Sequence, residues 1–135
     1  MRAKNLVLLG AVLLALTGCG GGEDAGGSAS SSFAAPADGD TVSSPVPVEM
    51  AAEGFEVAPA EGATEGQGHF HIMVDTDCVA EGETVPSDET HLHFGDGSTS
   101  TEVELEPGEH TLCLQAGDAT HSAFGATDEI TITVE

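Results

Sequence analysis

The sequence has no Trp, no Tyr, only five Phe, and two basic residues against 24 acidic ones. The basic pair, Arg2 and Lys4, lies at the extreme N-terminus, before the first acidic residue. A chain so poor in cations cannot neutralise phosphates, which excludes binding to nucleic-acid backbones. An anionic membrane surface would repel it as well. With few aromatic residues, the core must be built from Val, Leu, Ile and Phe, and small cores of this kind often need a covalent or metal link.

A long hydrophobic run is also missing. Residues 6–16 are apolar, follow Arg2 and Lys4, and are too short to span a bilayer, which is typical of a signal peptide. The run ends in Leu16-Thr17-Gly18-Cys19, which resembles a bacterial lipobox. We therefore expect residues 1–18 to be removed and Cys19 to be lipidated as the mature N-terminus, since several acyl chains on one residue give stable anchoring. The alternative is a plain secretory signal with an incidental Cys.

The composition changes twice after Cys19. Residues 20–36 are rich in Gly, Ser and Ala without periodicity, and residues 19–37 are interpreted as the lipidated Cys and a flexible tether. Residues 38–135 are interpreted as one folded domain, extracytoplasmic and held at the bacterial cell envelope. After removal of residues 1–18 the chain would keep all 24 carboxylates and no Lys or Arg, a formal charge of −24.

The domain reads as short alternating runs separated by turn residues, with no convincing helical period. Pro45 and Pro47 confine the first run to a sheet edge. This pattern predicts an all-β fold, an immunoglobulin-like antiparallel sandwich of six to seven strands. The expected strands are residues 42–50, 53–57, 67–75, 91–94, 99–105, 110–115 and 129–135.

Two cysteines remain once Cys19 is assigned to lipid. Cys78 and Cys113 form an even pair in a chain expected to be exported, which predicts a disulfide. Such a bond would stabilise a small core that carries strong self-repulsion. The alternative is that both thiolates ligate a metal beside the histidines.

Histidines form the clearest chemical pattern. Two H-x-H pairs occur, and residues i and i+2 of a strand share a face, so both imidazoles of a pair can reach one ion. If the two strands are neighbours, four nitrogens could converge on copper or zinc, with a thioether and a loop histidine nearby. The alternative is a solvated histidine face without metal. The candidate ligands are His69, His71, Met73, His91, His93 and His121.

A further histidine has a structural interpretation. The run Pro107-Gly108-Glu109-His110-Thr111-Leu112 resembles the turn into a strand that carries the tyrosine corner of immunoglobulin-like folds, with His110 in place of the Tyr. We expect His110 to be a core residue hydrogen-bonded to nearby backbone rather than a ligand.

Several motifs in combination resemble an uncharacterised family of exported bacterial proteins of unknown function. Members typically read G-H-H-H-L-L-I-D, H-x-H-F-G-x-G-Q-T-E, P-G-x-H-T-L-Q-L and G-D-x-x-H, which match residues 68–75, 91–95, 107–112 and 117–121 here. The resemblance covers roughly residues 42–135. This chain departs from it at Phe70, where the family often has a third His, and at Cys78 and Cys113.

A weaker likeness is to copper/zinc superoxide dismutase, because residues 68–71, followed by Asp75 and Cys78, look like its copper strand. That enzyme also needs a zinc loop and an Arg over the copper, and this chain has no Arg after residue 2. No nucleophile elbow, phosphate loop or paired-carboxylate site stands out either. The sequence therefore predicts a lipid-anchored binding module for copper or zinc. The alternatives are a structural or protein-interaction module of the envelope without metal and, remotely, a dismutase-like enzyme.

Overall fold

The computed structural model describes residues 28–135. The expected signal peptide, the expected lipidation at Cys19 and the first part of the expected tether lie outside these residues. Nine strands and no helix occur in the described part, so no helix there could cross a membrane. The strands are β1 (Ser30–Ala35), β2 (Thr41–Val42), β3 (Val46–Glu53), β4 (Glu56–Val57), β5 (Gln67–Val74), β6 (His91–Phe94), β7 (Ser100–Val103), β8 (Gly108–Gly117) and β9 (Ala123–Val134).

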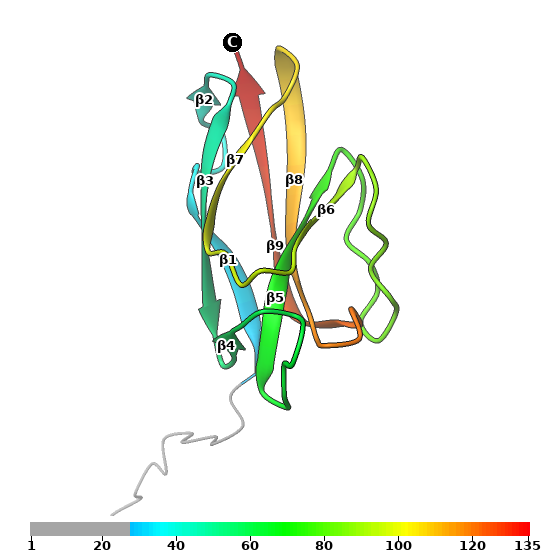
Figure 1. The fold of residues 1–135 in the computed structure, drawn as a ribbon. Coiled ribbons are helices and arrows are strands. Elements are labelled where there is room, and N and C mark those ends of the chain that lie inside the picture. Colours follow the sequence, from blue (N-terminus) through cyan, green and yellow to red (C-terminus); the bar gives the residue numbers. More distant parts are fainter. Residues whose placement is uncertain (1–27) are drawn as a thin grey trace, which may run out of the picture.

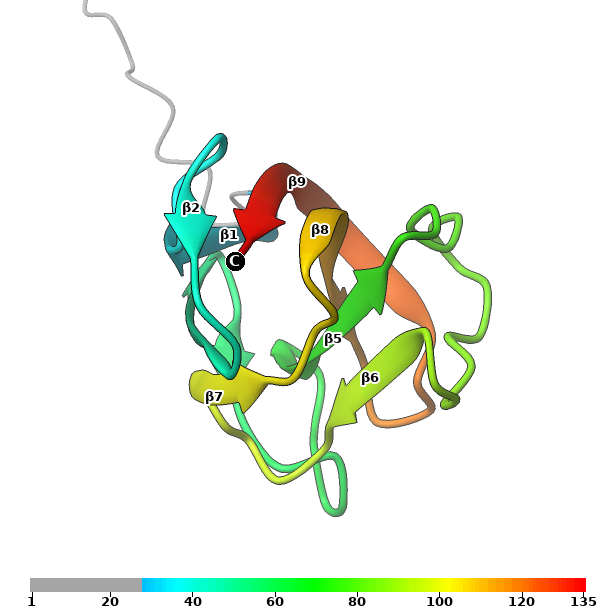
Figure 2. The same ribbon diagram turned by 90° about the horizontal axis from the view of Figure 1, so that it is seen from above.

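All nine strands belong to one curled sheet (Figure 1). Its order is β4-β5-β8-β9-β1-β3-β7, while β6 pairs with β5 and β2 pairs with β9. Seen end-on, β1, β3 and β7 lie opposite β5, β6 and β8 across the interior (Figure 2). The structure confirms the all-β fold class, and the curled sheet is consistent with a sandwich. It adds strands to the expected six or seven, and three pairings, β1–β9, β2–β9 and β4–β5, are parallel.

The interior is a single apolar core to which both halves of the curl contribute. Alternation places every second side chain of each long strand inward, so the expected period-2 pattern is the reason the core forms. Its buried members are Val46, Val48, Met50, Phe70, Ile72, Val103, Leu112, Leu114, Ile130, Ile132 and Val134.

Strand β1 lies in the segment that was expected to be tether. It pairs antiparallel with β3, and Asp128 of β9 accepts a hydrogen bond from the amide of Phe33 at 2.8 Å. The expectation of a flexible tether up to residue 37 is therefore wrong for Ser30–Ala35. The sequence of this strand, rich in Ser and Ala, shows no alternation of apolar and polar residues that would have predicted it. The strand is held instead by backbone pairing with β3 and by one aromatic residue, Phe33.

The strand that positions the functional side chains, β5, is buried on both faces from Gly68 to Met73. Phe70 and Ile72 face the core. The opposite face is covered by the loop between β5 and β6 and by the loop between β8 and β9. These two loops are joined by backbone hydrogen bonds, among them Val85 N to His121 O at 2.8 Å.

A disulfide fastens the covering loop to the sheet. Cys78, just after β5, is bonded to Cys113 of β8, with 5.8 Å between the Cα atoms, as the sequence predicts. The Gln115 side chain accepts a hydrogen bond from Val79 N and donates one to Val79 O. The covering loop is thus tied down at the start of its course over β5.

His110 makes the expected hydrogen bond to nearby backbone, but it is half-buried and lies outside the core in which it was expected. Nε2 lies 2.7 Å from the carbonyl oxygen of Glu106, and Nδ1 lies 2.7 Å from Oδ2 of Asp75, whose Oδ1 accepts a hydrogen bond from Thr111 N. Both partners of the imidazole are acceptors, so the doubly protonated ring fits best. The hydrogen bond that His110 donates to Asp75 raises the pKa of His110. Burial opposes ionisation of Asp75, but the bonds from Thr111 and His110 outweigh it and lower its pKa.

Replacing Asp75 by Asn should lower the free energy of unfolding by about 1 kcal/mol near pH 5.5, after allowing for screening of this half-exposed carboxylate. The raised pKa of His110 makes its contribution fade as the pH rises above about 6.5, and the lowered pKa of Asp75 makes its contribution fade below about 4. The deficit should therefore shrink at pH 9. Urea unfolding at both pH values measures it, with Asp77→Asn as the matched loss of charge. An equal deficit at pH 5.5 and 9 would contradict the ion pair.

Candidate metal centre

Four histidines meet on the covered face of β5. His69 and His71 come from β5, His93 from β6 and His121 from the loop between β8 and β9. One ring nitrogen from each lies within 4.8 Å of all the others. Two β5 side chains and two side chains from separate elements thus converge on a volume that one ion could occupy.

Strand register selects which histidine of β6 takes part. In the antiparallel β5–β6 pair, His93 stands opposite His71 and His91 stands opposite Met73. Because residues opposite each other across a ladder share a face, His93 lies beside both β5 histidines. His91 lies two residues further along β6, beside Met73 and away from the cluster.

Two glycines make room for the rings. A Cβ added at Gly117, which pairs with His69 across the β5–β8 ladder, would lie 2.8 Å from Nε2 of His71. A Cβ added at Gly95 would lie 2.6 Å from Nε2 of His93. Any larger residue at either position would force the neighbouring ring to move. Sequence reasoning did not single out these two glycines, since their role follows from close approach across strands.

His121 is held by a tight turn. Its φ of 62° lies in the left-handed region, and its amide donates to Asp118 O at 2.8 Å. The Asp118 carboxylate accepts hydrogen bonds from the amides of Thr120 and Ser122. The backbone of His121 is fixed further by the bond from Val85, so its ring is presented to the cluster by a rigid loop.

Hydrogen bonding alone does not satisfy the nitrogens of this cluster. Nε2 of His69 lies 2.9 Å from Nε2 of His71 and 3.0 Å from Nδ1 of His121. An imidazole nitrogen carries either one proton or one in-plane lone pair, so Nε2 of His69 can serve only one of these neighbours well. Nδ1 of His69 and Nδ1 of His71 are buried without a protein partner. One cation between the three crowded nitrogens would use all their lone pairs at once.

Burial keeps the inner rings neutral. Loss of solvation, followed by the fields of His93 and His121, lowers the pKa of His69 to about 4. Loss of solvation, followed by the field of His69, lowers the pKa of His71 to about 3. The pKa of His93 is also lowered, by partial burial and then by His121, while Asp96 opposes the shift. At neutral pH the lone pairs of these rings are available to a metal without competition from protons.

The other candidate ligands lie elsewhere. Met73 belongs to a small apolar cluster with Val85, Cys113 and Ala123. Nδ1 of His91 lies 2.8 Å from the Asp88 carboxylate near the surface. Cys78 and Cys113 are bonded to each other, so the alternative of thiolate ligation is not supported. The structure brings together His69, His71, His93 and His121 of the six candidates.

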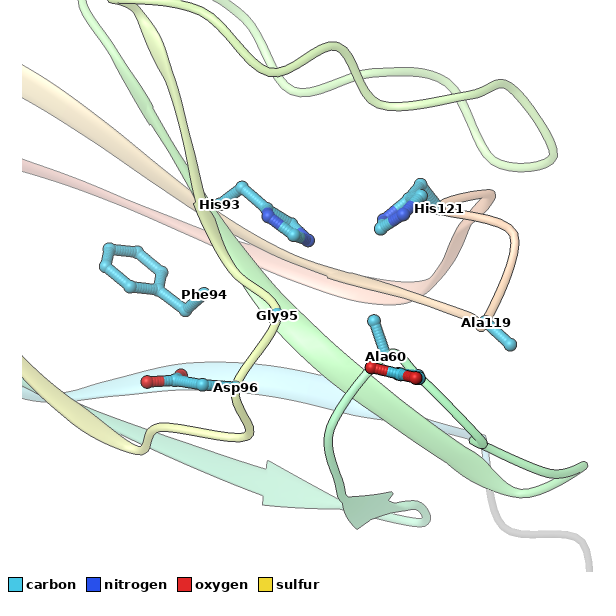
Figure 3. A pocket seen from close by; sticks show the side chains of 8 residues that line it. Ala60, His93, Phe94, Gly95, Asp96, Ala119 and His121 are labelled. Carbon is cyan, nitrogen blue, oxygen red and sulfur yellow. The ribbon is translucent and has the colours of Figure 1, made fainter.

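The cluster is open on one side. A surface depression of about 550 Å³ is lined by His93, His121, Gly95, Asp96 and Glu61, among others, and the rings of His93 and His121 point toward one another at its edge (Figure 3). A smaller pocket of about 120 Å³ reaches His71, His93 and His121 from beneath the covering loop. His69 and His71 are 0% and 1% exposed, whereas His93 is exposed and His121 half-buried.

The four imidazole nitrogens form a donor set that could hold a metal ion. Imidazole nitrogen suits both Zn(II) and Cu(II), and zinc–nitrogen bonds of about 2.0–2.1 Å imply edges of about 3.3 Å in a tetrahedral site. The crowded pairs at 2.9 and 3.0 Å and the 4.8 Å limit bracket that value. Small rotations of the rings would bring the four nitrogens to bonding distance.

The metal-free protein should lose stability as the pH falls below about 6.5. In this range His71 binds a proton in the unfolded chain but stays neutral in the folded protein, where its pKa is about 3. When the pH is lowered from 7.5 to 5, the free energy of unfolding of His71→Leu should rise by about 1–2 kcal/mol relative to that of wild type. Urea unfolding in the presence of a chelator checks this. His91→Leu, which alters a histidine outside the cluster, serves as the control. A constant difference between His71→Leu and wild type would refute the buried neutral state.

Comparison with known proteins places the chain in a family without assigning an activity. A search of the curated proteins and a search of the solved structures found no match. A family model described as a domain of unknown function (DUF4399) matches residues 48–135. This match spans every strand from β5 onward and all four clustered histidines. The chain is therefore a member of this family of unknown function.

Proposed function

We propose that this protein is a lipid-anchored, extracytoplasmic metal-binding module of the bacterial cell envelope, which holds Cu(II) or Zn(II) through His69, His71, His93 and His121. The observation that carries the proposal is the convergence of four ring nitrogens within 4.8 Å, two of them on fully buried side chains. The role would be to sequester the ion or to deliver it at the envelope.

The choice of metal follows from the donors. Four neutral imidazoles without a thiolate favour Cu(II) and Zn(II), and Cu(II) binds such nitrogen sites more tightly than Zn(II). The sequence raised Met73 as a soft ligand for copper. The side chain packs instead in an apolar cluster, which weakens the case for Cu(I).

The surroundings favour binding over dismutation. The depression beside the histidines is lined by Glu61 and Asp96, and residues 28–135 contain no Lys or Arg. A negative field of this kind attracts metal cations and repels the superoxide anion. A dismutase-like activity therefore has no electrostatic support in the described part of the chain.

The metal site should depend on the β5 histidines and not on those outside the cluster. Wild-type protein should bind one equivalent of Cu(II), and His69→Ala/His71→Ala should bind at least about 100-fold more weakly, since two buried ligands are lost. Calorimetric titration measures the affinity, and electron paramagnetic resonance of the Cu(II) form reports nitrogen ligation. His91→Ala and His110→Ala, which remove histidines outside the cluster, are the matched controls. Equal Cu(II) affinity of the double variant and wild type would refute the proposed site and favour the alternative of an envelope module without metal.

The anchoring part of the proposal rests on the sequence of residues 1–19. We expect Cys19→Ser to abolish incorporation of labelled palmitate and to move the protein from the membrane fraction to the soluble fraction of the expressing bacterium. Cys78→Ser/Cys113→Ser, which removes the other two cysteines, should still be labelled. Retention of the Cys19→Ser protein in the membrane fraction, with label, would rule out lipidation at this residue.

A further inference from the structure

The four histidines differ sharply in their access to solvent. His69 and His71 are fully buried on β5, between the core and the covering loops. His93 is exposed at the end of the short edge strand β6, and it borders both the 550 Å³ depression and the 120 Å³ pocket. An ion bound by all four would therefore be fixed from within by two rigid ligands and closed off from solvent by His93 and His121.

The depression is also the place where charge would attract a cation. Glu61 and Asp96 line it beside the two outer rings, and the field of Asp96 is felt at His93. The smaller pocket is lined by Thr84, Val85 and Ser87 in addition to histidines, without a carboxylate. Since carboxylates raise the local concentration of cations, approach through the depression is favoured over approach through the pocket.

Resting on the proposed function, we propose that the divalent cation enters and leaves the centre through this depression, with His93 as the ligand that detaches to open it and Glu61 and Asp96 as the groups that draw the ion in. His93 can play this part because β6 is four residues long and pairs with the sheet only through β5. Its side chain is exposed, whereas those of His69 and His71 are buried.

Gly95 offers a way to disturb His93 without removing a ligand. A Cβ at this position meets the His93 ring, 2.6 Å from Nε2, and the backbone of Gly95 is outside the left-handed region, so alanine is allowed there. Gly95→Ala should therefore press the ring outward while His69, His71 and His121 stay in place. This variant tests whether His93 is the ligand that detaches. Removing the charges of Glu61 and Asp96 at the rim of the depression tests whether the ion enters there.

The experiment measures rates in addition to affinity, with the purified protein and Cu(II) ions as the probe. Stopped-flow absorption follows uptake of Cu(II), and a chase with excess EDTA follows release. Asp96→Asn/Glu61→Gln should take up Cu(II) about five-fold more slowly than wild type at low ionic strength, with the difference vanishing in high salt. Glu109→Gln/Glu135→Gln removes two charges at the opposite end of β8 and β9 and should match wild type. Gly95→Ala should release Cu(II) about ten-fold faster.

The outcomes separate this inference from the proposed function. If wild type binds no Cu(II), both fail. If wild type binds Cu(II) through nitrogen ligands but the rim variant takes it up as fast as the control at low salt, the ion enters elsewhere and the route is overturned. If Gly95→Ala releases the ion at the wild-type rate, His93 is not the ligand that opens the centre. Slower uptake in the rim variant together with faster release from Gly95→Ala supports the proposal.

Discussion

The structure depends on the burial of β5 on both faces. One face, with Phe70 and Ile72, closes the apolar core, and the other places His69 and His71 beneath two loops. A strand covered on both sides usually carries apolar residues throughout. Here the second face carries the imidazoles of His69 and His71, which burial keeps neutral and whose hydrogen-bond partners are other histidines. This exception to ordinary core composition is where a metal would resolve an otherwise unfavourable arrangement.

Two connected loops cover the histidine face of β5: the loop between β5 and β6 and the loop between β8 and β9. The disulfide between Cys78 and Cys113 and the bonds of Gln115 to Val79 hold the start of the covering loop. The same loop then bonds to the segment that carries His121, so the position of this ring is linked through the chain to the disulfide. In a small protein with few aromatic residues, a covalent link and a metal centre would share the task of fastening loops that the core alone does not hold.

The negative charge of the described residues also bears on the histidine cluster. Residues 28–135 contain many carboxylates and no Lys or Arg, so no internal salt bridge to a basic side chain can offset their repulsion. Within residues 28–135, histidine supplies the only side-chain cations, and His110 acts in this way beside Asp75. The buried rings of His69 and His71 do not, because loss of solvation lowers the pKa of both. They would instead bring positive charge into the protein as a bound divalent ion.

The sequence by itself determined the all-β class, most of the strands, the Cys78–Cys113 pair and the shared face of each H-x-H motif, because alternation with period 2 and pairing of cysteines are local or compositional signals. Tertiary structure decided that His93 and His121 join His69 and His71, while His91 and Met73 do not. That choice depends on the register of β6 against β5, on a turn closed by Asp118 and on glycines that let rings approach. Strand β1 was likewise beyond sequence reasoning, because its pairing is made by backbone groups that every residue carries.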